Sequence, residues 1–188
     1  MTPAAGPFAV AAALLVLAGA PKIARPRDTV NALHAVGIPA PVVSVRVAAF
    51  AEVAIGADAL VNGNRPSGVF VALAYALFTA FVLLAFRRGA PLTSCGCFGR
   101  PDTPPTWIHV AVNAAAIAAA AAVAADPGAG LPDAFRRQPY GGVPYGLLVV
   151  CGTALAYLAL STLPRLRPGG DGGSGPSSER WPGRRARV

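Results

Sequence analysis

Long apolar stretches recur along the 188-residue chain, and they constrain its fold more than any other feature. Crossing about 30 Å of hydrocarbon takes about 20 residues of helix, at a rise of about 1.5 Å per residue. Only 13% of the residues are charged, about half of the share that soluble domains carry. The sequence therefore predicts an all-α integral membrane protein with transmembrane helices at residues 4–24, 42–61, 69–86, 107–125 and 143–163.

The first stretch contains Ala18-Gly19-Ala20, which resembles a signal-peptidase site. No Lys or Arg precedes the apolar run, however, and Pro21 stands directly after the cleavage position. A retained helix is therefore the favoured interpretation over a cleaved signal. Lys22, near the end of this helix, is expected to extend its ammonium group to the membrane surface.

The composition changes after Pro164, where Gly, Pro, Ser and Arg replace the aliphatic residues. Such a segment buries too little apolar surface to become ordered, so we expect a disordered basic tail over residues 165–188. Its arginines orient the chain and contact anionic membrane lipid, an interpretation preferred to nucleic-acid binding. Residues 1–125 then form a four-span unit, and residues 126–164 a loop with the fifth span.

Basic residues gather in alternate connections: the loop after the first span, the loop after the third, and the tail. The positive-inside rule predicts a multi-pass protein of the cell membrane, with its N-terminus outside and these three segments in the cytoplasm. The loop after the third span would then face a compartment in which thiols are kept reduced. The alternative, in which that loop faces outward, requires one span fewer before it.

Two of the three cysteines, Cys95 and Cys97, flank Gly96 in that loop. Cα atoms two residues apart lie within about 7 Å, so a disulfide is reachable, and its small ring would be strained. Strained exposed disulfides exchange readily, whereas closing so short a loop stabilises a fold little. The spacing predicts a redox pair. We expect no metal, since zinc would need His34 and His109 as further ligands; two unreactive cysteines are the plainest alternative.

A few polar side chains fall inside the predicted spans. Glu52 lies near the middle of the second, where a carboxyl group is protonated, paired with an arginine, or hydrogen-bonded to another helix. His109 and Asn113 are four residues apart in the fourth span, share one helix face and directly follow the cysteine loop. These three residues are candidates to support the thiol chemistry, or they bond helices together. Cys151, in the fifth span, is expected to pack as a small hydrophobic residue.

The string Cys95-Gly96-Cys97-Phe98-Gly99 after the third span, together with Lys22, Glu52 and Asn113, resembles the MauE family. That family is named for methylamine utilisation and is related to DoxX-type membrane proteins. The resemblance covers roughly residues 4–125 and implies a DoxX-like four-helix transmembrane bundle, here followed by a fifth helix. It also implies disulfide handling or maturation of a client protein, such as the methylamine dehydrogenase light subunit, with thioredoxin-like proteins as redox neighbours.

Two functions stay open on these residues. In the first, the protein is a thiol-disulfide oxidoreductase: one cysteine attacks a client disulfide, the other resolves the mixed disulfide, and electrons pass to a quinone or a thioredoxin-like protein. A variant of this function resembles the vitamin K epoxide reductase class, which relies on a Cys-x-x-Cys that this chain lacks. In the second, the protein is a non-catalytic membrane assembly factor or chaperone whose loop docks a partner.

Overall fold

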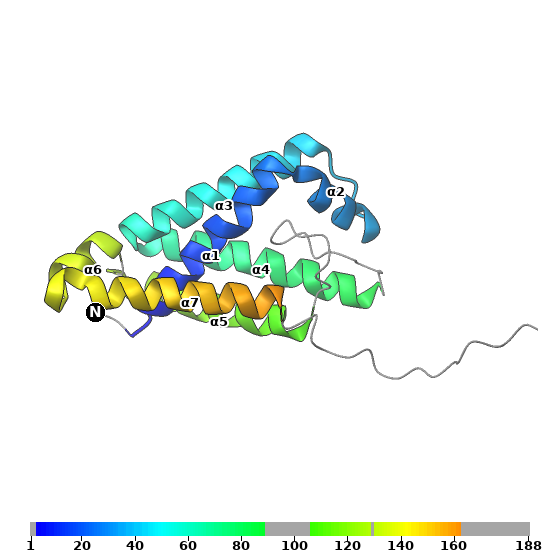
Figure 1. The fold of residues 1–188 in the computed structure, drawn as a ribbon. Coiled ribbons are helices and arrows are strands. Elements are labelled where there is room, and N and C mark those ends of the chain that lie inside the picture. Colours follow the sequence, from blue (N-terminus) through cyan, green and yellow to red (C-terminus); the bar gives the residue numbers. More distant parts are fainter. Residues whose placement is uncertain (1–2, 89–105, 129, 163–188) are drawn as a thin grey trace, which may run out of the picture.

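The computed structural model describes residues 3–88, 106–128 and 130–162, and every regular element within these ranges is helical. The long helices are α1 (Ala5–Ala24), α3 (Val42–Asn62), α4 (Arg65–Arg87), α5 (Trp107–Ala125) and α7 (Val143–Ser161). Two connections contain shorter elements: α2 (Pro26–Ala35), α6 (Leu131–Arg137) and a 3-10 turn at Pro139–Gly142. Successive long helices run in opposite directions between the two ends of the molecule (Figure 1).

Helix α4 begins earlier than the apolar pattern predicts, at Arg65 rather than at residue 69. Asn64 caps it, because its side-chain oxygen accepts a hydrogen bond from the Ser67 backbone N–H at 3.0 Å. Pro66 occupies the first turn, where the missing N–H leaves no helical bond unmade. The other four predicted spans agree with the observed helices to within two residues.

In the described part of the chain, four segments are long and apolar enough to cross a membrane: α1, α4, α5 and Tyr140–Ser161, which contains α7. Helix α3 falls short on composition, because Arg46, Glu52 and Asp58 all lie within its length. The prediction of five spans is thus supported for four helices. The predicted tail, residues 165–188, lies outside the described residues.

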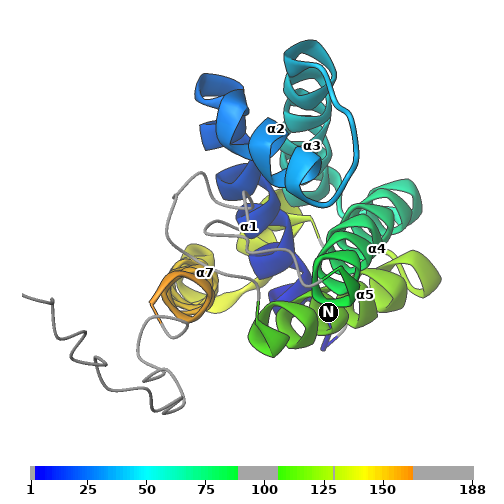
Figure 2. The ribbon, with the colours of Figure 1, turned by 90° about the vertical axis from the view of Figure 1, so that its right-hand side faces the viewer.

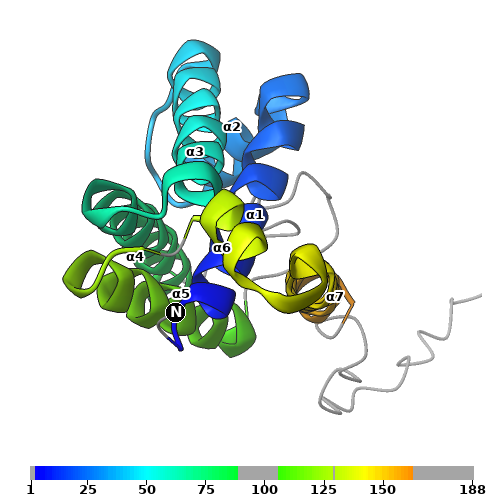
Figure 3. The same cartoon turned by 90° about the vertical axis from the view of Figure 1, so that its left-hand side faces the viewer.

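Helix α1 lies at the centre of the bundle, with α3, the α4–α5 pair and α7 arranged around it (Figure 2). It is the most buried of the four candidate spans, and its side chains Phe8, Ala12 and Leu15 are fully enclosed. At the end where the chain begins, α6 lies across the bundle between α3 and α7 (Figure 3). The apolar core is therefore built around α1.

Two glycines allow α1 and α3 to approach closely. A Cβ atom on Gly56 of α3 would lie 2.7 Å from the carbonyl oxygen of Ala12 on α1. A Cβ atom on Gly19 of α1 would lie 2.8 Å from the carbonyl oxygen of Ala49 on α3. Small residues at such contacts are typical of helix packing in membranes, where backbones meet directly.

We expect Gly56→Ala to lower the free energy of unfolding by about 1–3 kcal/mol, because the added methyl group meets main chain that cannot move aside. Gly6→Ala is the matched control, since its Cβ would meet the Leu148 side chain at 3.6 Å, an ordinary contact. Thermal unfolding of the purified protein in detergent measures both variants. Equal melting temperatures would contradict the close contact between α1 and α3.

The connection after α1 and the end of α4 meet at one end of the bundle, which we call the α2 end. Arg88, the C-cap residue of α4, donates a hydrogen bond from Nη1 to the carbonyl oxygen of Val36, the C-cap residue of α2. Ala32, Val36 and Ala85 form a small buried cluster beside this bond. Helix α5 also begins at the α2 end, so the end of α4 and the start of α5 lie at the same end of the bundle (Figure 1).

Candidate functional site

A buried ion pair joins α1 to α3 near the α2 end. The Nζ atom of Lys22 lies 2.9 and 2.8 Å from the two carboxylate oxygens of Glu52, and the two side chains are only 6% and 14% exposed. Gly19, one turn before Lys22, makes room for the Glu52 side chain. The ammonium group also lies 4.6 Å from the ring centroid of Phe78 on α4, within cation–π range. The pair thus connects three helices.

The expectation that Lys22 reaches the membrane surface is wrong. Its side chain turns inward, because a carboxylate enclosed alone would carry a large desolvation penalty and the ammonium group offsets it. Glu52 does bond to another helix, as one of the alternatives held, but the partner is a lysine rather than an arginine. The signal in the sequence was a cation near the end of one apolar stretch and a carboxylate near the middle of the next.

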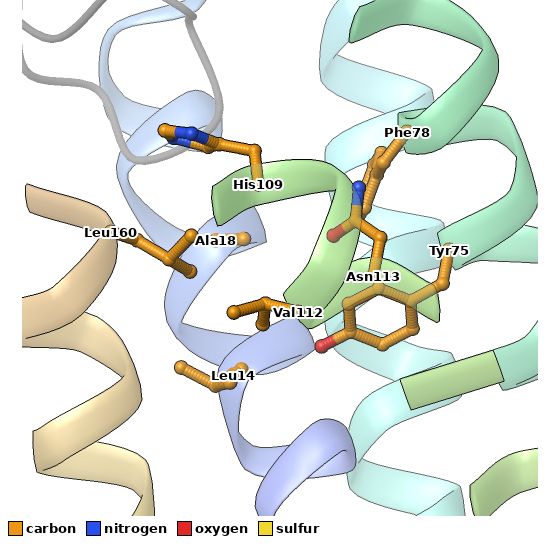
Figure 4. A pocket seen from close by; sticks show the side chains of 8 residues that line it. All are labelled: Leu14, Ala18, Tyr75, Phe78, His109, Val112, Asn113 and Leu160. Atoms are coloured by element: carbon orange, nitrogen blue, oxygen red, sulfur yellow. The ribbon is translucent and has the colours of Figure 1, made fainter. Parts of the chain in front are cut away.

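A cavity of about 20 Å³, large enough for one water molecule, lies between α1, α4, α5 and α7 (Figure 4). The Tyr75 hydroxyl points at α1 and donates a hydrogen bond to the Ala11 carbonyl oxygen at 2.7 Å. The Asn113 amide lies beside Phe78, whose ring also contacts Lys22. The ion pair and the cavity are therefore neighbours. The cavity is lined by Leu14, Ala18, Tyr75, Phe78, His109, Val112, Asn113 and Leu160.

The first turn of α5 holds His109 in a defined tautomer. The backbone N–H of Thr106 points at His109 Nδ1 at 3.2 Å, and the Thr106 hydroxyl lies 3.1 Å from the same atom. A backbone N–H can only donate, so Nδ1 accepts and the neutral ring carries its proton on Nε2. His109 is 3% exposed, and Nε2 has no hydrogen-bond partner among the described residues. Unpartnered buried donors are rare and cost about 1–3 kcal/mol.

The structure brings His109 and Asn113 together in one cavity, as their spacing predicts. Cys95 and Cys97 lie outside the described residues, so their distance from His109 stays a prediction. Sequence reasoning did not single out Tyr75 and Phe78, because aromatic residues in an apolar run form no distinguishing pattern. Within the described ranges, no three His, Cys, Asp or Glu side chains come together as metal ligands would.

An apolar groove of about 580 Å³ runs between α1, α5 and α7 and shares Leu14 and Val112 with the cavity. Cys151 of α7, which was expected to pack as a small hydrophobic residue, lines this groove and is exposed rather than covered by another helix. Helix α7 packs lightly: only 11% of its candidate span is buried, and Leu147, Val150 and Leu155 face outward. An outermost helix leaves a small residue such as Cys151 without a neighbour to cover it.

Long apolar helices that enclose an ion pair and a small cavity are typical of a small helical membrane protein. The chain belongs to the MauE family: the family model described as methylamine utilisation protein MauE matches residues 2–126. This match confirms the resemblance carried by the cysteine string and covers helices α1 to α5, whereas α6 and α7 follow it. No curated protein and no solved structure matches the chain.

Proposed function

We propose that all five long helices cross the membrane, with α1, α3, α4 and α5 as a DoxX-like unit and α7 as an additional span. Helix α1 ends and α4 begins at opposite ends of the bundle, so α3 must return the chain across it (Figure 1). Its 21 residues are about 31 Å long, which matches the hydrocarbon thickness. Val43, Val47 and Phe50 are 71%, 63% and 58% exposed, so the outer face of α3 suits lipid, while Glu52 turns inward.

We further propose that the α2 end is cytoplasmic and the N-terminus outside. Arg25 and Arg27 stand beside the end of α1, and Arg87 and Arg88 close α4, so four cations gather at the α2 end. The connections at the opposite end carry Arg65, and Arg136 and Arg137 near two aspartates. By the positive-inside rule, the end with the larger number of basic residues faces the cytoplasm.

We propose that the protein is a thiol redox component in which Cys95 and Cys97 exchange disulfides with a client or a thioredoxin-like protein. One observation carries this proposal: α4 ends and α5 begins at the α2 end, where the Lys22–Glu52 pair and the His109 cavity are buried, and both cysteines fall between these two helices in the sequence. Polar groups enclosed between membrane helices usually serve a site or a pathway. Here they lie near the end of α4 and the start of α5, and the sequence between these two helices holds the only two thiols that are close in the chain.

The exchange balances without a further reagent. A thiolate of the pair attacks the client disulfide, a mixed disulfide forms, and the displaced client sulfur takes up a proton. The second cysteine of the pair then attacks the mixed disulfide, which closes the Cys95–Cys97 bond and releases the second client thiol. The client gains two electrons and two protons, and the pair loses them. The reverse sequence oxidises a client, and the same variants test both directions.

Thiol alkylation in native membranes tests this proposal and its sidedness together. In a Cys151→Ser background, we expect a mild oxidant to remove two alkylation sites from the protein and a reductant to restore them. A membrane-impermeant maleimide should label the reduced pair only after the cells are opened. Alkylation that is unchanged by oxidant and reductant would contradict the redox function, and labelling of intact cells would contradict the cytoplasmic placement.

The family description points to methylamine utilisation as the setting in which a client protein would be found. Disulfide content of a methylamine-oxidising enzyme, compared between cells with and without this protein, is the corresponding measurement. The second candidate, a non-catalytic assembly factor, is favoured by the ion pair itself, since a buried pair can specify how helices join without any chemistry. In that case a client would still mature in cells that carry only Cys95→Ser/Cys97→Ser protein.

A further inference from the structure

We infer that the apolar groove and the adjoining cavity form one binding site for a neutral, carbonyl-bearing lipid with a long apolar chain, the chemistry of an isoprenoid quinone. The groove receives the chain and the ring, and the water-sized cavity receives one carbonyl oxygen of the ring. This site is formed where α1, α5 and α7 pack together, and it does not require the cysteines. Its use as an electron acceptor rests on the proposed function: one dithiol and one quinone would give one disulfide and one quinol.

The groove has the size and lining of a lipid site. Its volume of about 580 Å³ falls within the range of about 300–1,000 Å³ that small-molecule sites occupy. Small residues make the space, among them Gly6 on α1, Ala115 on α5 and Gly152 on α7. The groove and the cavity together extend along α1 from Gly6 to Ala18, a distance of about 18 Å at the rise of an α-helix. An extended apolar chain fits along this length.

The polar end of the site offers one unsatisfied donor. Leu14 and Val112 line both spaces, so the groove adjoins the cavity that His109 lines. The Nε2–H group of His109 is buried without a partner among the described residues, and a quinone carbonyl oxygen is an acceptor that matches it. The cavity lies near the α2 end, where the first turn of α5 begins. A lipid with its head near the membrane surface and its chain inside would have this orientation.

The charges around the cavity favour a neutral head group over a phosphate. The ammonium group of Lys22 is held by both oxygens of Glu52, so it is not free to bind an anion. The Tyr75 hydroxyl already donates to the Ala11 carbonyl oxygen. No cationic side chain stands among the described residues that line the cavity or the groove. A phospholipid head would therefore lose its hydration without gaining a counter-charge.

Quinone binding to the full-length protein in nanodiscs tests the site, with decylubiquinone as the probe. Quenching of Trp107, two residues before His109, reports binding in a Trp181→Phe background. We expect His109→Leu to weaken binding about fivefold, as the loss of one buried hydrogen bond does, and His109→Gln, which keeps a donor, to weaken it less. Ala115→Phe fills the groove and should weaken binding about tenfold or more. Ala114→Phe, an exposed neighbour outside the groove, is the matched control.

Three results would overturn the inference: parent-like affinity in both His109→Leu and Ala115→Phe, equal competition by a phospholipid, or equal competition by a saturated hydrocarbon without a carbonyl. Melting temperatures of the variants show whether each is folded. If His109→Leu does not fold, the affinity of His109→Gln tests the role of the donor instead. The Cys95→Ser/Cys97→Ser protein should bind the quinone as the parent does. Binding in that protein, with thiol exchange lost, separates this inference from the proposed function.

Discussion

Lys22→Met is expected to lower the free energy of unfolding by about 3–5 kcal/mol, the loss typical of breaking a buried pair on one side. The substitution keeps the length and the apolar stem of the side chain but removes the ammonium group that offsets the Glu52 carboxylate and is bonded to it at 2.8 and 2.9 Å. Glu52 would then be left between α1 and α3, where its side chain is 14% exposed. Thermal unfolding in detergent or in nanodiscs measures the loss.

Two further variants test whether the loss of stability comes from the unpaired Glu52 carboxylate. Lys22→Met/Glu52→Leu removes both charges and should recover most of the lost stability, because an apolar pair of similar size often replaces a buried ion pair at little cost. Arg27→Met removes a cation from an exposed position of α2 and should leave the melting temperature near that of the parent. If Lys22→Met and Arg27→Met have the same melting temperature, the Lys22–Glu52 pair does not stabilise the bundle.

One of the single variants Cys95→Ser and Cys97→Ser is expected to accumulate a mixed disulfide with its partner, while thiol exchange falls to the background rate. The variant that keeps the attacking cysteine can form the first intermolecular bond, but it has no second thiol to resolve that bond. The other variant lacks the attacking thiol and should form no adduct. Non-reducing gels of native membranes, followed by mass spectrometry of the adduct, measure the difference.

Cys151→Ser is the control for this trapping, because Cys151 lies exposed on α7, beside the apolar groove, and is not part of the proposed exchange. It should neither form the adduct nor prevent its formation in the parent. An adduct that persists in Cys95→Ser/Cys97→Ser protein would mean that Cys151 is the reacting thiol. The loop would then not be the redox site.

The apolar stretches allowed the long helices to be predicted almost residue by residue, since each is set by a local pattern of side chains. Helices α2 and α6 were not predicted, because they are short and carry few apolar residues. The four-residue error at the start of α4 has a related cause: its first turn is Arg65, Pro66 and Ser67, and the signal is the Asn64 cap rather than hydrophobicity. A capping residue before an apolar run therefore marks the start of this helix more closely than hydropathy does.

The candidate site was predictable only in part, because partners on different helices leave no local trace in the sequence. His109 and Asn113 share a helix face by spacing alone, and in the structure both line one cavity. The pairing of Lys22 with Glu52 depends on how α1 packs against α3, and Gly19 and Gly56 are the residues that permit that contact. The exposure of Cys151 depends on the outer position of α7, which hydropathy does not encode.

The central claim is that Cys95 and Cys97 form a redox-active pair, and disulfide exchange by the purified protein tests it most directly. Reduced Cys151→Ser protein in nanodiscs would be mixed with a fluorogenic disulfide peptide, and the released thiol would be followed over time. The account predicts reduction of about one peptide disulfide per protein, with closure of the Cys95–Cys97 bond, and only background reduction by Cys95→Ser/Cys97→Ser protein. Equal, background-level reduction by both proteins would contradict the account and leave the protein as an assembly factor.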